Sequence, residues 1–466
     1  MKDSSHHITK DLVGRSIDTS VPVLLLKLGC YPLHHGTVGA IRSFGRLGVP
    51  VFGVHESENS PASKSRYLKG CAFGVLSVSD PAACLERIIQ IGQRIGRQSL
   101  LIPTDDAGAI LLAEQQDVLR PYFLFPEQQT SLARTVAAKD KLYRLCRNCG
   151  IPTPSTAIIS NTDDLYRVLQ SGKFPLVLKN AHPWLSPDGV RSTMLIYSVE
   201  AALDYWHKLN KKSQCKMIVQ EYIPGEYSED WIYNGYHNAG GMPVVGFTGR
   251  KLRSFPPYTG SLSFGMSIHN VELVEIVRHL TTALRYNGVI DLDFRFDKRD
   301  GKYKLVDFNP RVGAQFQLFR NDAAVDVVRA MHLDLTGRDV PSGMQVDGRE
   351  FISEIFDPRS FLIYRKNKEV SFRRWLAEFW RSEERAWVAW DDLRPFVTVC
   401  RGAVERRVRR VWQHLAKSVS IKFGFSKFEL KRPGTPHEIN AASRQAPSTV
   451  RAGVTAGSDC RNGEKK

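Results

Sequence analysis

Residues 289–309 contain the side chains best suited to metal and phosphate chemistry. Residues 289–297 alternate almost strictly between apolar and charged side chains, and residues 303–309 follow after a short turn. Successive side chains of a strand point to opposite faces, so the pattern predicts a hairpin whose charged residues share one face. Pairing about the turn sets Asp293 opposite Asp307, where like charges are destabilising unless a cation lies between them. Such oxygen ligands suit Mg²⁺, which takes one or two carboxylates together with nucleotide phosphates.

The end of the second strand adds two groups of the same chemistry. Asn309-Pro310-Arg311 places an amide and a guanidinium just beyond Asp307. An arginine there can clamp phosphate oxygens beside a metal ion. The simpler alternative is a hairpin with a solvated acidic face.

Two lysines and a Pro-Gly sequence that follows a predicted strand lie upstream, in the order that a nucleotide site would require. Lys179 ends the apolar strand predicted over 174–179, where a buried stem can carry its ammonium group into a cleft. Lys139 lies in a helix predicted over 135–148, before a proline-rich boundary. Residues 220–225 form an extended edge followed by Pro-Gly, which is typical of a hinge. The alternative for both lysines is an ordinary surface position.

The elements that position these groups follow an α/β pattern. Residues 21–125 alternate short apolar runs with helical patterns, which predicts parallel strands covered by helices in a Rossmann-like half. Gly29, Gly36 and Gly39 do not have the spacing of a dinucleotide fingerprint. We predict these divisions: an N-terminal domain over 20–130, a small subdomain over 131–225, a large subdomain with the metal site over 226–345, a C-terminal extension over 346–430, and a disordered tail over 431–466.

Composition limits the class of protein. The 466 residues are 42% hydrophobic, enough for a sizeable core, and carry 65 Lys+Arg against 48 Asp+Glu. No apolar run is long enough to cross a bilayer, and residues 1–20 lack a signal-peptide pattern, so a cytoplasmic location is expected. The eight cysteines form no disulfide framework, and Cys146 and Cys149 lack the partner pair of a metal site.

The excess positive charge gathers near the C-terminus. Residues 401–466 contain 15 Lys+Arg and 5 Asp+Glu. Over 401–426 the pattern predicts a basic amphipathic helix, which either rests on an anionic membrane surface or packs on the protein with its charges in water.

Residues 20–340 resemble the ATP-grasp superfamily, and within it the carboxylate-amine ligases. The resemblance rests on residues 138–141 with 151–154, on 175–179, on 220–225 and above all on Asp307-Phe308-Asn309-Pro310-Arg311. It implies an ATP-grasp fold: an N-terminal Rossmann-like (pre-ATP-grasp) domain, a small α/β subdomain and a C-terminal α+β subdomain. It also implies ATP and Mg²⁺ as cofactors, with Mn²⁺ as a substitute.

The resemblance also implies a role for each matched position. For ATP, Lys139 and Lys179 would contact the phosphates, Glu221 and Ile223 would line the adenine, and Glu226 or else Glu229 would contact the ribose. Mg²⁺ would be held by Asp293, Asp307 and Asn309. The transferred phosphoryl group would be stabilised by Arg311. Three positions depart from the family pattern: loop 180–191 contains only Gly189, Asp307 stands where glutamate is commoner, and Asp291 stands where some relatives have an arginine, a role that Arg295 could take.

The implied reaction forms an amide through an acylphosphate. Its substrates would be a small carboxylate and a small amine, both amino-acid-like, and no nucleic-acid partner is expected. The resemblance leaves open whether the protein forms a homodimer. Arg295 and the basic run Arg250, Lys251 and Arg253 could hold the acid, or the run could be a solvated strand edge. His34 and His35 either line the substrate cleft or only begin a helix. The alternatives are another ATP-grasp chemistry, such as carboxylation through carboxyphosphate, or a non-enzymatic protein that binds anions through its net charge of +17.

Overall fold

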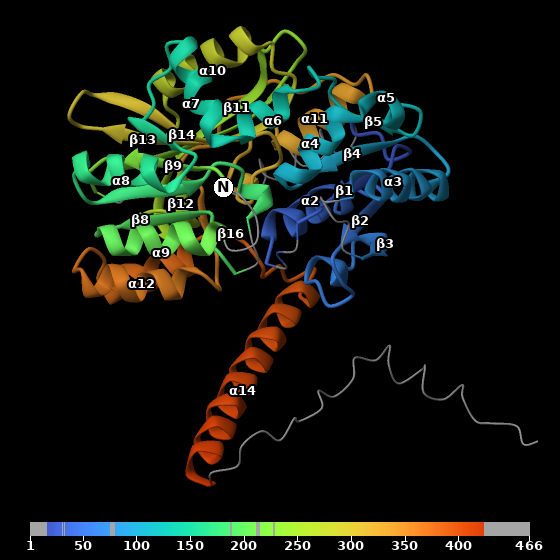
Figure 1. Cartoon of the computed structure of the whole chain (residues 1–466). Helices are drawn as coiled ribbons and strands as arrows, with labels where there is room; N and C mark the ends of the chain where they lie inside the picture. Colours follow the sequence, from blue (N-terminus) through green and yellow to red (C-terminus); the bar gives the residue numbers. More distant parts are fainter. Residues whose placement is uncertain are drawn as a thin grey trace, which may run out of the picture. The chain divides into compact units, whose positions relative to one another are not determined.

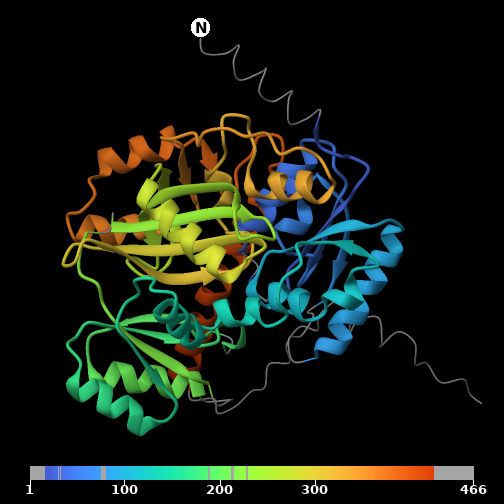
Figure 2. The same cartoon turned by 90° about the horizontal axis from the view of Figure 1, so that it is seen from above.

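The computed structural model describes residues 16–29, 31, 33–74, 80–186, 189–210, 215–226 and 229–423. The chain divides into two compact units, Met1–Gly402 and Ala403–Lys466. The first unit contains three sheets, which occupy separate regions of the molecule (Figures 1 and 2). The predicted tail over 431–466 lies outside the described residues, and so does the end of the predicted helix over 401–426.

The first sheet has five parallel strands in the order β3-β2-β1-β4-β5. Its elements are β1 (Val23–Leu26), α2 (His35–Gly45), β2 (Val51–His55), η1 (Ala62–Lys64), β3 (Leu68–Phe73), α3 (Pro81–Ile95), β4 (Ser99–Pro103), α4 (Asp106–Glu114), α5 (Gln116–Leu119) and β5 (Phe123–Leu124). Val23 and Leu25 enter one hydrophobic core and Leu24 and Leu26 enter another, so both faces of β1 are covered. This confirms the predicted Rossmann-like half, although β3 was not foreseen.

His34 and His35 begin α2, as the simpler of the two predictions had it. The His34 side chain accepts the N–H of Thr37 and caps the helix. His35 is buried against the rings of Phe351 and Trp387.

The small sheet has the order β6-β9-β7-β8, with every pair antiparallel. The elements from its approach to its last strand are α6 (Leu132–Ala137), α7 (Lys139–Asn148), β6 (Thr156–Ile159), α8 (Thr162–Ser171), β7 (Leu176–Asn180), η2 (Pro183–Leu185), β8 (Thr193–Ile196), α9 (Val199–Asn210) and β9 (Met217–Glu221). The single helix predicted over 135–148 is wrong. Ala138 has extended backbone angles and separates α6 from α7.

The large sheet has seven strands in the order β14-β13-β10-β11-β12-β15-β16. Its strands and helices are β10 (Asp230–His237), β11 (Pro243–Phe255), β12 (Ser261–Ser267), α10 (Val271–Leu284), β13 (Gly288–Asp297), β14 (Lys302–Asn309), η4 (Phe316–Leu318), α11 (Val327–Leu335), β15 (Glu350–Ile352) and β16 (Glu384–Arg385). The sheet therefore continues beyond residue 345, where we predicted the end of the large subdomain. The exact domain boundaries stay a prediction.

The remaining helices are α12 (Asp357–Lys366), α13 (Phe372–Arg381) and α14 (Arg394–Phe423). Arg253 of β11 joins α12 and α13 to the large sheet. Its guanidinium donates to Asp357 at 2.8 and 3.1 Å, pairs with Glu378, and lies 4.2 Å from the centre of the Phe264 ring. All three charged groups are buried. The suggestion that Arg253 holds an acid substrate is therefore wrong, because its donors are consumed within the fold.

None of the described helices is long and apolar enough to cross a membrane. Cys146 and Cys149 are free thiols, and burial raises the pKa of Cys146 to about 12. The Cys146 thiol is therefore protonated at neutral pH.

Three buried histidines should make the stability of the folded protein sensitive to acid. Burial lowers the pKa of His35 and His55 to about 4 and that of His237 to about 3. In the unfolded chain these side chains bind protons below about pH 6.5, whereas in the folded protein they stay neutral. The free energy of unfolding should therefore fall as the pH drops from about 7.5 to about 5, by about 2 kcal/mol per histidine. Urea denaturation at the two pH values measures this difference.

His237→Asn should reduce the dependence of the free energy of unfolding on pH. The control His269→Asn, at an exposed position, should leave that dependence unchanged. Equal stability at both pH values would contradict the prediction.

Candidate functional site

A cavity of about 430 Å³ lies between the small sheet and the large sheet. This volume is within the range of small-molecule sites. Its walls come from β7 and β9 of the small sheet, from β11, β13 and β14 of the large sheet, and from the segments that follow β9 and β11. Among the predicted site residues, its lining includes Lys179, Glu221, Ile223, Asp293, Arg295 and Asp307. Lys139, Glu226, Asn309 and Arg311 are not part of that lining.

The acidic hairpin has the predicted register. Asp293 of β13 pairs with Asp307 of β14, and Leu292, Phe294 and Phe308 point to the opposite side, into a hydrophobic core. The register shifts just after Asp293, because Phe294 pairs with Leu305 and leaves Val306 as a bulge. The apolar core thus fixes the orientation of the strands and directs both carboxylates into the cavity.

Two lysines from the small-sheet region meet this hairpin. Lys139 Nζ forms a close ion pair with Asp307 Oδ1, and Lys179 Nζ donates to the main-chain oxygen of Val306 at 2.9 Å. Lys139 is the first residue of α7, and its N–H donates to Ala181 O at 2.8 Å. The break at Ala138 therefore sets the position of Lys139. Burial lowers the pKa of Lys179 to about 8, an effect that the charge of Asp307 opposes.

A third lysine enters the cavity from β11. Lys251 Nζ lies 2.8 Å from Asp293 Oδ1 and also approaches Gly260 O. Burial disfavours its charge, but Asp293 and Asp230 outweigh this and raise its pKa. The sequence placed Lys251 only in a basic run. Its role depends on the alternation along β11, which turns Lys251 toward Asp293.

Positive charge exceeds negative charge around the carboxylate pair. Burial alone would raise the pKa of Asp307, but Lys139 and Lys179 outweigh it and hold that pKa below its ordinary value. The lining as a whole has four acidic and four basic side chains, but around Asp293 and Asp307 three ammonium groups meet two carboxylates. This local excess of positive charge attracts a polyanion such as a phosphate chain.

Arg311 and Asn309 lie one step further along the hairpin. Arg311 Nη1 is 3.1 Å from Asp291 Oδ2, and its Nε is 3.4 Å from Asp106 Oδ1 in the first sheet region. Asn309 donates from Nδ2 to Asp291 O at 3.0 Å. Burial raises the pKa of Asp291 to about 6, although Arg311 opposes the rise. Both predicted groups are therefore next to the carboxylate pair and outside the cavity lining.

Among the described residues, no group of three or more His, Cys, Asp or Glu side chains could hold a metal ion by itself. The donor set at Asp293 and Asp307 consists of two carboxylates, which fits an Mg²⁺ ion that takes its other ligands from phosphates and water. It does not fit a permanent all-protein metal cage.

Comparisons with known proteins agree with this architecture. No protein-family model matches the chain. The D-aspartate ligase of Enterococcus faecium is 27% identical over 229 residues, which cover 47% of this chain and 54% of the relative. The chain therefore aligns with about half the length of this curated relative.

Solved structures extend the likeness to most of the chain. The N5-carboxyaminoimidazole synthetase of Staphylococcus aureus, solved with ADP, has a TM-score of 0.54 at 12% identity, over 72% of this chain and 82% of that one. The L-amino acid ligase of Bacillus licheniformis has a TM-score of 0.51 at 13% identity, over 67% and 74%. The biotin carboxylase domain of Hydrogenobacter thermophilus 2-oxoglutarate carboxylase, solved with MgADP, has a TM-score of 0.51 at 15% identity, over 69% and 71%.

The chain has the ATP-grasp fold. This confirms the fold class and the resemblance predicted from the sequence.

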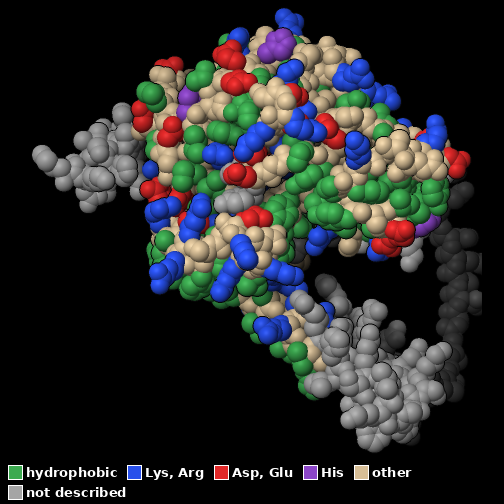
Figure 3. Space-filling view, turned by 90° about the vertical axis from the view of Figure 1, so that its left-hand side faces the viewer, with side chains coloured by type: hydrophobic (Ala, Val, Ile, Leu, Met, Phe, Trp, Pro, Cys, Tyr) green, Lys and Arg blue, Asp and Glu red, His purple; other side chains and the backbone are tan. Residues whose placement is uncertain are grey.

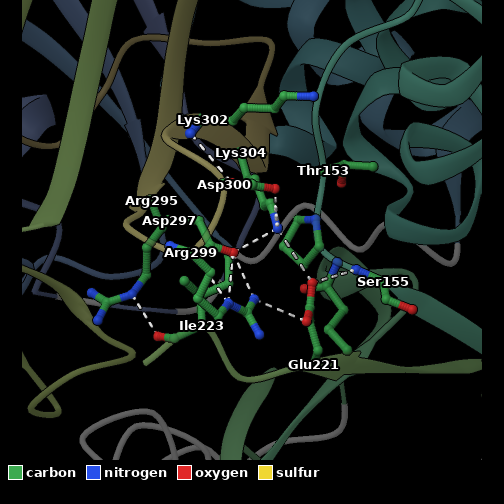
Figure 4. A network of polar contacts seen from close by, with 12 residues as sticks. Thr153, Ser155, Glu221, Ile223, Arg295, Asp297, Arg299, Asp300, Lys302 and Lys304 are labelled. Carbon is green, nitrogen blue, oxygen red and sulfur yellow. Dashed lines mark hydrogen bonds and ion pairs between the residues drawn. The ribbon is translucent and has the colours of Figure 1, made fainter. Parts of the chain in front are cut away.

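Within this ATP-grasp fold, the segment after β9 is anchored by Arg295. Its guanidinium donates to Ile223 O at 2.9 Å and to Gly225 O at 3.2 Å, and pairs with Asp230 at 2.8 Å. Figure 4 shows Arg295 reaching Ile223 from β13. Its donors are thus occupied by the protein, so Arg295 positions the hinge of the cavity.

Glu221 is held from the other side of the hinge. Its carboxylate accepts the N–H of Ser155 at 3.1 Å and pairs with Arg299 at 3.1 Å and with Lys304 at 3.6 Å (Figure 4). Glu226 is exposed and Glu229 is buried, and both approach Lys298, at 3.8 and 2.9 Å. Neither of the two lines the cavity.

The far wall of the cavity depends on the C-terminal extension, which the sequence did not explain. Tyr258 lines the cavity in a left-handed backbone conformation with φ of +70°. Its hydroxyl donates to Glu369 at 2.7 Å and accepts from Asn367 at 2.6 Å. We call residues 367–369 the strap; it holds the Tyr258 loop in place.

Removal of the Arg295 side chain should loosen the hinge. Arg295→Ala breaks a largely buried ion pair and releases two carbonyl oxygens, so we expect a loss of about 2–4 kcal/mol in the free energy of unfolding. The segment between β9 and β10 should also become a new site of limited proteolysis. Chemical denaturation and mass spectrometry of the fragments measure both effects. Lys302→Ala, at an exposed position of β14, is the control; an unchanged cleavage pattern in Arg295→Ala would contradict the anchoring role.

Proposed function

We propose that this chain is an ATP- and Mg²⁺-dependent, ADP-forming ligase that joins a small carboxylate to an amine through an acylphosphate. The observation that carries the proposal is the pairing of Asp293 with Asp307 inside a cavity that Lys179 and Lys251 also enter, with Lys139 bound to Asp307. These groups come from both sheets and converge where a metal-bound triphosphate would require them.

Asp293 and Asp307 would hold Mg²⁺, with Asn309 as the third protein ligand. The ion would supply charge neutralisation to the phosphate oxygens. Lys139, Lys179 and Lys251 would then bind phosphate oxygens in place of the carboxylate and carbonyl contacts that they make here.

The remaining residues of the site would orient the substrates. Glu221 and Ile223 would contact the adenine at the hinge, because both line the cavity there. Arg295 would keep the hinge in place, and Arg311 would steady the transferred phosphoryl group. Glu226, or failing that Glu229, is proposed for the ribose; neither lines the cavity, and both approach Lys298, at 3.8 and 2.9 Å.

The proposed reaction has two steps. A carboxylate oxygen of the acid attacks the γ-phosphorus of ATP, and the bond to the bridging oxygen breaks to release ADP. The amine then attacks the acyl carbon; inorganic phosphate departs with the electron pair of the C–O bond, and the amine loses its proton to solvent or buffer. Positioning and charge neutralisation provide most of the catalysis in phosphoryl transfer, which agrees with the three lysines around the carboxylate pair.

Two relatives support amino-acid-like substrates by their names, D-aspartate ligase and L-amino acid ligase. The deciding experiment is a screen for ADP release with Mg²⁺, ATP, and pairs of amino acids and small carboxylic acids, with D-aspartate among the acids. ADP should appear only when acid and amine are both present. ADP that forms with bicarbonate and no amine would replace this proposal by carboxylation. ATP binding without turnover by any pair would contradict the ligase.

The lysine that contacts Val306 should be required for nucleotide binding. Lys179→Met removes a buried ammonium group, and we expect at least about a tenfold loss of affinity for MgATP, equivalent to about 1.4 kcal/mol. Because the pKa of Lys179 is about 8, affinity for MgATP should weaken above that pH, where the free protein loses the charge. Isothermal titration calorimetry measures both. Lys302→Met is the matched control, and equal affinity in Lys179→Met would contradict the assignment.

The paired carboxylates should be required for turnover rather than for folding. Asp307→Asn keeps the size of the side chain and removes a metal ligand, so ADP release should fall at least about a hundredfold, as expected when charge stabilisation is lost at a reacting phosphate. Asp300→Asn, in the exposed turn of the same hairpin, should leave the rate unchanged. Circular dichroism checks the fold of both variants. Turnover that persists in Asp307→Asn would place the metal elsewhere.

A further inference from the structure

Helix α13 has apolar side chains on an inner face and on an adjoining outer face. On the inner face, Trp375 stacks on Phe361 at 4.5 Å between ring centres, and its indole N–H donates to Asp357 at 2.9 Å. On the outer face, Phe372, Leu376 and Trp380 follow one another at intervals of four residues and are 48%, 39% and 72% exposed. An ordinary surface helix has one apolar stripe, directed at the core. Phe372 also packs inward, since its ring centre lies 6.2 Å from that of Phe361 and 5.8 Å from that of Trp375. The exposed areas of Leu376 and Trp380 are not explained by packing within the protein.

The neighbouring helix α12 has the same property. Phe361 and Tyr364 are buried, while Leu362 and Ile363 point to solvent. The stacking of Phe361 on Trp375 places the two helices side by side. We call the exposed residues Leu362, Ile363, Phe372, Leu376 and Trp380 the α12–α13 face.

Within residues 357–381, the basic side chains face solvent and the acidic ones face the protein. Residues 357–381 contain seven Arg and Lys side chains, all exposed. They also contain three acidic side chains, and each is directed inward: Asp357 and Glu378 are buried with Arg253, and Glu369 accepts the hydroxyl of Tyr258. Figure 3 shows Lys and Arg side chains bordering hydrophobic ones at the level of α12. The outer surface of the two helices is thus apolar and cationic.

We propose that the α12–α13 face binds the surface of an anionic lipid membrane. Trp, Phe and Leu side chains enter the boundary between headgroups and acyl chains, and Arg and Lys side chains meet anionic headgroups, so one surface provides a partner for both kinds of group. A second copy of the chain fits less well, because pairing the same face would bring like charges together. A soluble polyanion would leave the apolar stripe in water. This contact uses α12 and α13, which are separate from the basic residues over 401–426, and it does not depend on the proposed ligase activity.

Vesicle flotation with the full chain tests the proposal. The protein should float with vesicles of phosphatidylcholine and phosphatidylglycerol, should not float with phosphatidylcholine alone, and should bind less at high salt. The variant Phe372→Ser, Leu376→Ser, Trp380→Ser should bind the anionic vesicles at least about tenfold less tightly, because each exchange removes apolar area from the interface. Wild-type protein that stays unbound, or a triple variant that binds like wild type, would overturn the proposal.

Two control variants separate the α12–α13 face from other exposed features. Trp390→Ser changes a tryptophan that is 87% exposed and lies outside both helices, so it should bind as wild type does. Arg406→Glu with Arg407→Glu changes the basic part of α14 and should retain most of the binding; a full loss in this variant, with none in the triple serine variant, would overturn the proposal.

The oligomeric state and the fold are checked on the same samples. Sedimentation velocity of wild type and triple variant should give the same molar mass, and a dimer that the serine substitutions dissociate would make this face an interface between copies. If the triple variant fails to fold by circular dichroism, Lys366→Glu with Arg373→Glu replaces it, since both side chains are exposed. That variant should also lose binding to anionic vesicles, and wild-type binding would contradict the proposal.

Discussion

The repulsion between Asp293 and Asp307 is the constraint on which the cavity depends. The two carboxylates face each other on adjacent strands because the opposite face of the hairpin is committed to the core. Such a pair is stable only when cations surround it. Lys139 and Lys251 provide those cations from positions 168 and 42 residues away in the chain. The hairpin, α7 and β11 must therefore all be in place before the charges are compensated, which couples the formation of the site to the packing of α7 beside the large sheet.

The hairpin and the faces of its strands could be predicted from the sequence because both depend on local rules. A period of two fixes the faces, and the turn at Asp300-Gly301 brings the two strands together. The bulge at Val306, which sets Asp293 opposite Asp307, is not visible in the sequence. Local rules also predict the parallel order of the first sheet, where continuous apolar strands alternate with helices. The positions of the remaining groups depend on long-range packing. Ala138 interrupts a run with good helical periodicity, and the role of Lys251 depends on the alternation of β11 against neighbours that its own sequence does not identify.

The C-terminal extension was the least predictable part because its attachment is a buried polar network. Arg253 contacts Asp357 and Glu378 across 104 and 125 residues of chain. In the sequence, all three residues are indistinguishable from solvated charges. A buried ion pair of this kind is a weak source of net stability, but removing one partner is costly because it leaves a buried charge. The arrangement therefore determines where α12 and α13 lie more than how stable the protein is.

Because of the strap, two walls of the cavity are held by different parts of the chain. The groups that would bind phosphates lie in or beside the two central sheets. The Tyr258 loop is instead held by residues 367–369, which follow all strands of the large sheet except β16 in the sequence. Mutations in the strap can therefore reshape one side of the chamber without disturbing the charge-bearing side. In evolutionary terms, such a division lets the shape of the pocket beside Tyr258 diverge among descendants while the charged groups of the two sheets are inherited unchanged.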